Sequence, residues 1–110
     1  MKQREIWYAD LNPTRGREQK GVRPVVIISG DTMNDHSDLC IVCPLTSQIK
    51  NFASGVLLKK DGSNKLKEDS EILAFQVRTV SQHRFTKKIG AITADQLRTV
   101  LERLIEVFQY

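Results

Sequence analysis

Long apolar runs are missing from this chain of 110 residues. The two longest, residues 25–28 and 39–43, are far shorter than the roughly 18 residues that suggest a membrane-spanning helix. The charged start of the chain is not followed by an apolar stretch typical of a signal peptide. We therefore expect a soluble, cytoplasmic protein with no membrane partner.

Internal repeats, low-complexity tracts and linkers are also absent. Hydrophobic residues make up 40% of the chain and charged residues 27%, an ordinary globular balance. A chain of this length can bury a core without disulfide bonds. The sequence predicts a single domain over residues 1–110.

Cysteine and histidine are scarce, with two residues of each. Cys40 and Cys43 form a C-x-x-C spacing, but they lie in an apolar segment that reads as a strand, where positions i and i+3 point to opposite faces. Zinc needs four ligands, and the chain has neither a second C-x-x-C nor paired histidines. We interpret both cysteines as small buried side chains and expect no metal site and no cofactor.

Charge is unevenly placed along the chain, whose formal net charge is +4. Residues 1–30 carry a net charge of +3 and residues 59–88 a net charge of +4, whereas the other two segments are slightly acidic. Two basic segments on one face would attract a polyanion, but they are also compatible with solvated loops. Lys59, Lys60, Lys65 and Lys67 fit the solvated alternative best.

Short strands are predicted over most of the chain, with a loop of about ten residues at 12–21. The segment 24–29 is apolar on both faces, as in a strand buried on both sides. Residues 30–38 read as a polar turn. The other predicted strands are residues 5–9, 39–45, 55–58, 72–80 and 89–92.

The C-terminal segment has the period of an amphipathic helix. Thr93 and Gln96 have the spacing of a capping box at its start. The apolar positions are Leu97, Val100, Leu101, Leu104, Ile105 and Phe108. Strands followed by one helix predict a mostly β fold, a small antiparallel barrel or twisted sheet with a C-terminal helix packed against it.

Four motifs resemble the MazF/PemK family of bacterial toxin endoribonucleases. Residues 7–29 read WYADLNPTRGREQKGVRPVVIIS and are similar to the N-terminal signature of that family. Residues 44–47 (PLTS), 76–80 (QVRTV) and 88–90 (KIG) match further family segments in the same order. Together they span nearly the whole chain.

The resemblance implies an SH3-like small β-barrel, a homodimer and metal-independent, sequence-specific cleavage of single-stranded RNA. The 2′-hydroxyl would attack the adjacent phosphorus and leave a 2′,3′-cyclic phosphate and a 5′-hydroxyl. The implied partner is a small, acidic, partly disordered antitoxin, with which family toxins form a DNA-binding complex.

The same resemblance makes Arg23 and Thr46 the catalytic pair. An arginine offers a fork of donors suited to phosphate, and a threonine offers a hydroxyl. Because a guanidinium stays protonated, we assign Arg23 to charge stabilisation, with proton donation to the leaving 5′-oxygen as a further role. Glu18, in the nearby loop, has the chemistry of a general base.

Further substrate contacts are predicted around this pair. Gln76 and Arg78, two positions apart in a predicted strand, would share one face, one reading a base edge and the other holding a phosphate. Trp7 is interpreted as a core residue. The remaining candidates are Arg15, Arg17 and Lys20 for the RNA backbone, Asn12, Thr14 and Gln19 for bases, and Ser47 beside Thr46.

Several relatives carry an acidic residue where this chain has Ser81, which weakens any mechanism that needs that carboxylate.

Two other functions are compatible with the sequence. A gyrase-poisoning toxin on the same barrel would use a C-terminal Trp-Gly-Ile, whereas this chain ends Phe108-Gln109-Tyr110. The third alternative is a catalytically silent RNA-binding barrel.

Overall fold

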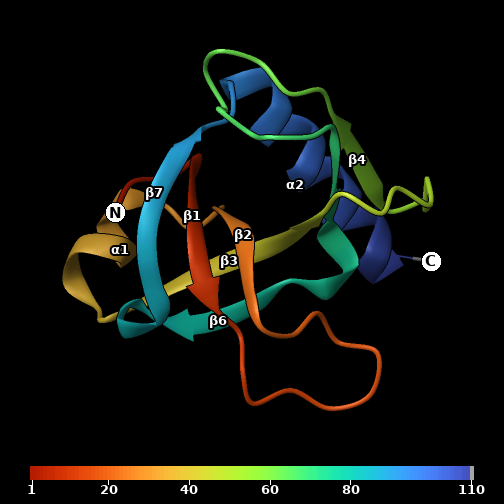
Figure 1. The fold of residues 1–110 in the computed structure, drawn as a ribbon. Coiled ribbons are helices and arrows are strands. Elements are labelled where there is room, and N and C mark those ends of the chain that lie inside the picture. Colours follow the sequence, from red (N-terminus) through yellow and green to blue (C-terminus); the bar gives the residue numbers. More distant parts are fainter. Residues whose placement is uncertain (110) are drawn as a thin grey trace.

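Seven strands form a bent antiparallel sheet in the computed structural model, which describes residues 1–109 (Figure 1). Tyr110, the last residue of the C-terminal tripeptide compared above, lies outside the described residues. The strands are β1 (Glu5–Asp10), β2 (Val22–Ile27), β3 (Leu39–Thr46), β4 (Gly55–Leu58), β5 (Ser70–Leu73), β6 (Arg78–Ser81) and β7 (Phe85–Ala91). The helices are α1 (Asp31–His36) and α2 (Ala94–Gln109), with two 3₁₀ turns, η1 (Ala74–Gln76) and η2 (Gln82–Arg84).

The strand order is β4-β5-β3-β2-β1-β7, and β6 pairs with β3 outside this path. One edge of β3 therefore binds two strands, β6 along Leu39–Val42 and β5 along Leu45–Thr46. Bending at β3 wraps the sheet into a small open barrel, with α2 packed beside it (Figure 1). The predicted fold class, mostly β with a C-terminal helix, is confirmed.

Two apolar clusters lie on opposite faces of the central strands. Val26 and Ile28 belong to the cluster that α2 covers, whereas Val25 and Ile27 belong to the other cluster. This alternation confirms that the segment 24–29 is buried on both faces. Trp7 packs against the second cluster, with its ring centroid 5.9 Å from that of Phe85, in agreement with its interpretation as a core residue.

The two cysteines divide between these clusters, Cys43 in the first and Cys40 in the second. Both are free thiols and fully buried. Burial raises the pKa of the Cys43 thiol to about 12 and also raises the pKa of Cys40. The interpretation of the pair as buried small side chains is confirmed.

The capping box forms as predicted at the start of α2. The backbone N–H of Thr93 donates to Oε1 of Gln96 at 2.8 Å, and the N–H of Gln96 donates to Oγ1 of Thr93 at 3.1 Å. Leu97 and Val100 are buried, but three other apolar positions of the helix are exposed. These are Leu101, Ile105 and Phe108, so the apolar stripe is wider than the face that packs on the sheet. Among residues 1–109, none of the helices has the length and apolarity needed to cross a membrane.

The largest departures from the predicted elements are three. The strand expected at 72–80 is interrupted by η1, because Ala74 turns into the core while Phe75 packs edge-on against Phe52 at 4.9 Å. Residues 30–38 contain the short helix α1 instead of only a turn. The last strand begins at Phe85, four residues before the predicted start, because it pairs along β1.

Candidate functional site

A groove of about 480 Å³ opens where β1, β2, β3 and β7 meet the segment 59–69. Five of its lining residues are basic, and its only acidic lining residue within the described chain is Glu68. The neutral polar lining includes Tyr8 and Ser47. We call this site the basic groove; its basic residues are Arg23, Lys65, Lys67, Lys87 and Lys88.

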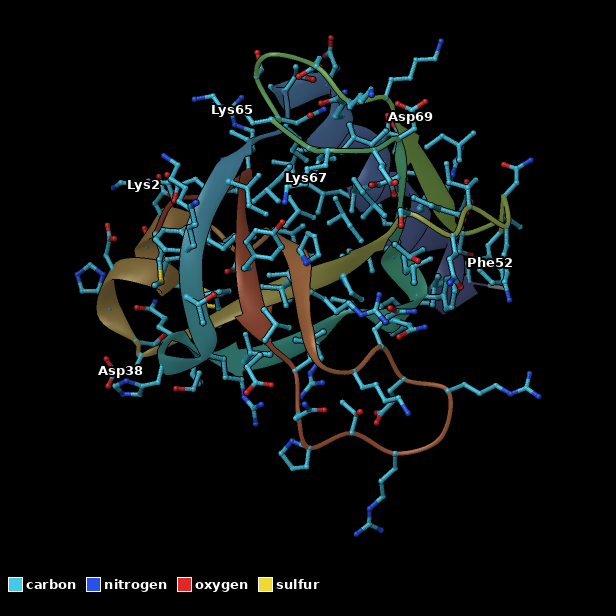
Figure 2. The ribbon with its side chains drawn as sticks, viewed as in Figure 1. Lys2, Asp38, Phe52, Lys65, Lys67 and Asp69 are labelled. Carbon is cyan, nitrogen blue, oxygen red and sulfur yellow. The ribbon has the colours of Figure 1, made fainter. Side chains whose placement is uncertain are left out.

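The segment 59–69 is folded onto the sheet and is not a freely solvated loop (Figure 2). Asn64 is buried, donates to the carbonyl of Lys59 at 2.8 Å and accepts from the N–H groups of Asp61 and Leu66. The N–H of Ala91 in β7 donates to the carbonyl of Ser63 at 3.2 Å. Lys65 and Lys67, which fitted a solvated loop in the sequence, are therefore held at the groove.

Gly90 permits this contact between β7 and the segment 59–69. A Cβ atom at Gly90 would lie 2.4 Å from the carbonyl oxygen of Asn64, and backbone cannot move aside as a side chain can. A larger residue here would push the lysine-bearing segment away from the sheet.

Arg23 and Thr46 lie at adjoining strand ends. The pairs between β2 and β3 run from Ile27–Val42 to Val25–Pro44, and the ladder ends two residues short of Arg23 and Thr46. Nε of Arg23 donates to the carbonyl of Lys20 at 3.0 Å, and neither Nη has a hydrogen-bond partner within residues 1–109.

Thr46 is buried, with 8% of the residue exposed. Its hydroxyl oxygen accepts from the N–H of Gln48 at 3.1 Å, which orients the side chain and leaves the hydroxyl proton available to another acceptor. Ser47, the next residue, lines the basic groove.

The loop 12–21 is tied to the sheet by side chains from the second basic segment. Gln76 accepts from the N–H of Gln19 at 2.9 Å, and Arg78 donates to the carbonyl of Leu11 at 3.3 Å. Arg84 donates to the carbonyl oxygens of Asp10 and Asn12. The inference that Gln76 and Arg78 share a strand face was wrong, because Gln76 lies in η1. Both side chains hold the loop, and their contacts with RNA remain predictions.

The predicted loop residues do not reach the basic groove. None of Asn12, Thr14, Arg15, Arg17, Glu18, Gln19 and Lys20 lines it in the described structure. Glu18 instead accepts from the N–H of Arg15 at 2.9 Å, and most of these residues are exposed. Their roles in RNA binding remain predictions.

Sequence reasoning missed Tyr8 and Glu68 of the groove, and it also missed Glu71, a fully buried carboxylate. The pairing of β1 with β7 brings Tyr8 opposite Lys87, and this contact between distant segments cannot be predicted from a local sequence pattern. Within residues 1–109, no three His, Cys, Asp or Glu side chains gather closely enough to hold a metal ion.

Lys88 is fixed at the groove by an ion pair with Glu5, whose Oε2 lies 2.7 Å from Nζ. Burial alone would raise the pKa of Glu5, but hydrogen bonds from Lys88, the N–H of Lys2 and the Trp7 indole together lower it to about 2. The pair neutralises part of the positive charge at one end of the groove.

Comparison with known proteins places these features in a family. The model of the PemK-like, MazF-like toxin of type II toxin–antitoxin systems matches residues 2–108. The chain is 36% identical over 101 residues to endoribonuclease MazF of Staphylococcus saprophyticus, covering 91% of this chain and 84% of that protein.

Solved structures share the fold. MazF of Deinococcus radiodurans superposes with a TM-score of 0.87 at 24% identity, covering 100% of this chain and 97% of that one. A mycobacterial endoribonuclease in complex with its cognate antitoxin superposes with a TM-score of 0.81 at 15% identity, covering 99% and 95%. The matching family model and the staphylococcal relative show that this chain belongs to the PemK/MazF family of type II toxin–antitoxin toxins.

Proposed function

We propose that this chain is a metal-independent endoribonuclease that cleaves single-stranded RNA at specific sequences, the toxin of a toxin–antitoxin pair. The observation that carries the proposal is the basic groove, which is lined by Arg23 and by Ser47, the residue after Thr46. Its relation to a named endoribonuclease, 36% identical over most of the chain, supports the same activity.

The reaction needs groups that stabilise charge on phosphorus-bound oxygens. The 2′-oxygen forms a bond to the adjacent phosphorus, the bond to the 5′-oxygen breaks, and the products are a 2′,3′-cyclic phosphate and a 5′-hydroxyl. The Nη groups of Arg23, whose Nε is already bound to Lys20, are donors for the phosphoryl oxygens as their charge grows. The Thr46 hydroxyl adds a neutral donor on the opposite strand end.

A general base must accept the proton of the 2′-hydroxyl. Glu68 is the carboxylate of the basic groove, whereas Glu18 binds the backbone of its own loop. We therefore assign the base to Glu68 in preference to Glu18. The leaving 5′-oxygen takes a proton from the Arg23 guanidinium, which regains one from water, while Glu68 returns the proton of the 2′-hydroxyl to water.

Partners follow from the charge and the exposed apolar surface. A small acidic antitoxin would compete with RNA for the basic groove by charge complementarity. The exposed apolar side chains of α2, namely Leu101, Ile105 and Phe108, support a homodimer, because large exposed apolar side chains on one helix face mark protein contacts. We propose that the toxin acts on RNA in the cytoplasm, where its complex with the antitoxin would bind DNA.

The test is incubation of the purified chain with an RNA pool of high sequence diversity in EDTA, followed by sequencing of the cleaved ends. We expect 5′-hydroxyl ends at a defined sequence. Arg23→Ala and Thr46→Val should each lower the rate by about a hundredfold or more. Arg98→Ala, which removes an exposed arginine of α2 that is paired with Asp95, is the control and should cleave normally.

Other results would overturn the proposal in distinct ways. RNA binding without product ends would indicate a silent RNA-binding barrel. Inhibition of DNA supercoiling by gyrase, with no RNA cleavage, would indicate the gyrase-poisoning alternative. Normal cleavage by Arg23→Ala would remove the catalytic assignment but not the activity.

A further inference from the structure

Glu71 is fully buried in β5, at a position where the barrel would ordinarily place an apolar residue. A charged group in such a site is costly unless its oxygens are hydrogen-bonded. Its two neighbours in β5, Ser70 and Ile72, are also buried, so the strand does not expose the carboxylate to water.

Three backbone N–H groups of one loop bind this carboxylate. Lys50 and Asn51 donate to Oε1 at 3.0 and 3.1 Å, and Phe52 donates to Oε2 at 2.7 Å. The loop is residues 47–54, the connection from β3 to β4, which begins directly after Thr46. In Figure 2, Phe52 marks its position at the edge of the molecule.

Gly55 makes room for the same carboxylate. A Cβ atom at this glycine would lie 2.0 Å from Oε2 of Glu71 and 2.7 Å from its Cδ. Gly55 lies in β4 and pairs with Leu73 of β5. The missing side chain of Gly55 therefore leaves space for the Glu71 carboxylate on the neighbouring strand.

Glu71 is also the pairing partner of Thr46 across β3 and β5. One residue therefore holds Thr46 through the strand ladder and, through its side chain, holds the loop that follows Thr46. The N–H of Gln48 in this loop orients the Thr46 hydroxyl, and Ser47 lines the basic groove.

We propose that Glu71 is a positioning residue for RNA cleavage, whose buried carboxylate folds the loop 47–54 so that the Thr46 hydroxyl stays aligned with Arg23. The inference rests on the proposed function. Glu71 does not line the groove, so it acts on the reaction through Thr46 and not on RNA binding.

The test compares three variants in single-turnover and steady-state cleavage of a short RNA that contains the cleaved sequence. Glu71→Gln replaces one of the two accepting carboxylate oxygens by an NH₂ group, which donates and cannot accept from the loop amides. Gly55→Ala displaces the carboxylate without changing Glu71. Gly30→Ala is the matched control, because apart from Gly30 and its two chain neighbours no atom of residues 1–109 lies within 4 Å of the added Cβ.

We expect Glu71→Gln and Gly55→Ala each to lower kcat between about tenfold and a hundredfold, because small misplacements of catalytic groups have effects of this size. KM should stay within about threefold, and the double variant should be no worse than the worse single variant, because both act on one contact. Gly30→Ala should cleave as the wild type does. Circular dichroism at the assay temperature verifies folding, and Glu71→Asp, which keeps the charge, replaces Glu71→Gln if the latter does not fold.

Wild-type kcat in folded Glu71→Gln and Gly55→Ala would overturn the positioning role, as would a raised KM with unchanged kcat. A lower melting temperature with an unchanged kcat would assign Glu71 to stability alone. Absence of cleavage by the wild-type chain would instead overturn the proposed function, so the two failures are distinguishable.

Discussion

Three glutamates illustrate how the setting of a single carboxylate decides its chemistry. Glu71 is buried and saturated by three backbone N–H groups, which suits it to hold structure. Glu18 accepts from the backbone of its own exposed loop. Glu68 lines the basic groove, and within residues 1–109 only its main-chain carbonyl is used, as acceptor for the Ser70 hydroxyl at 3.0 Å. Glu68 is thus the one whose side chain is free to meet a substrate.

The assignment of the general base gives a prediction at this scale. Glu68→Gln keeps the size of the side chain but cannot take a proton, so kcat should fall by about a hundredfold or more while RNA affinity changes little. Glu18→Gln is the matched control and should keep kcat within about threefold. The measurement is single-turnover cleavage with saturating enzyme. The opposite ranking of the two variants would return the base to Glu18.

At the scale of elements, the fold of the segment 59–69 determines which lysines of the second basic segment, residues 59–88, lie at the groove. It is anchored by the buried Asn64 and by the close approach to Gly90, and this contact turns Lys65 and Lys67 into groove residues. Lys59 and Lys60 belong to the same segment and do not line the groove. Two pairs of lysines with equal charge therefore differ in position, one pair at the groove and the other away from it.

Replacing each pair by alanine tests this difference. Lys65→Ala with Lys67→Ala should weaken RNA binding and reduce the slope of log affinity against log salt by about 1.4, because each phosphate contact on single-stranded RNA contributes about 0.7. Lys59→Ala with Lys60→Ala lowers the net charge equally and should leave the slope nearly unchanged. Binding is measured by fluorescence anisotropy over a salt series in the Arg23→Ala background, in which cleavage is expected to be slow. Equal losses in both pairs would indicate steering by net charge alone.

Elements defined by local signals were predictable from the sequence. The helix α2 begins at its capping box, and the doubly buried strand β2 follows from an apolar run, because both signals lie within a few residues. The break in the strand predicted at 72–80 depends on Ala74 reaching the core and Phe75 reaching Phe52. Contacts between distant segments do not produce a periodic pattern of apolar residues, so this break could not be predicted from the sequence.

The candidate site was predictable to a similar degree. Arg23 and Thr46 came from family motifs, and the β2–β3 register is compatible with their pairing. Glu68, Lys65 and Lys67 could not be assigned, because their position depends on the fit of a loop against Gly90, more than twenty residues away. Glu71 lies just before the strand predicted at 72–80, and only the amides of the loop 47–54, far from it in sequence, distinguish it from surface carboxylates.

For the whole molecule, the ion pair between Glu5 and Lys88 links the start of the chain to its last strand and thereby gives global stability a pH dependence. The pKa of Glu5 is lowered from 4.5 to about 2 in the folded state, and its side chain is only 14% exposed. A carboxyl with a lowered folded pKa stabilises the fold above its unfolded pKa, and this contribution is lost as the pH falls through the folded pKa.

Acid titration of stability tests this linkage. Above about pH 5 the ionised Glu5 should contribute up to about 3 kcal/mol to the free energy of unfolding, and the contribution should disappear between about pH 4.5 and pH 2. Glu5→Gln should therefore be less stable than the wild type at pH 6, and the two curves should converge toward pH 2. Glu102→Gln, at an exposed carboxylate of α2, is the control and should follow the wild type. Urea denaturation at each pH supplies the free energies, and parallel curves for wild type and Glu5→Gln would show that Glu5 titrates normally in the folded protein.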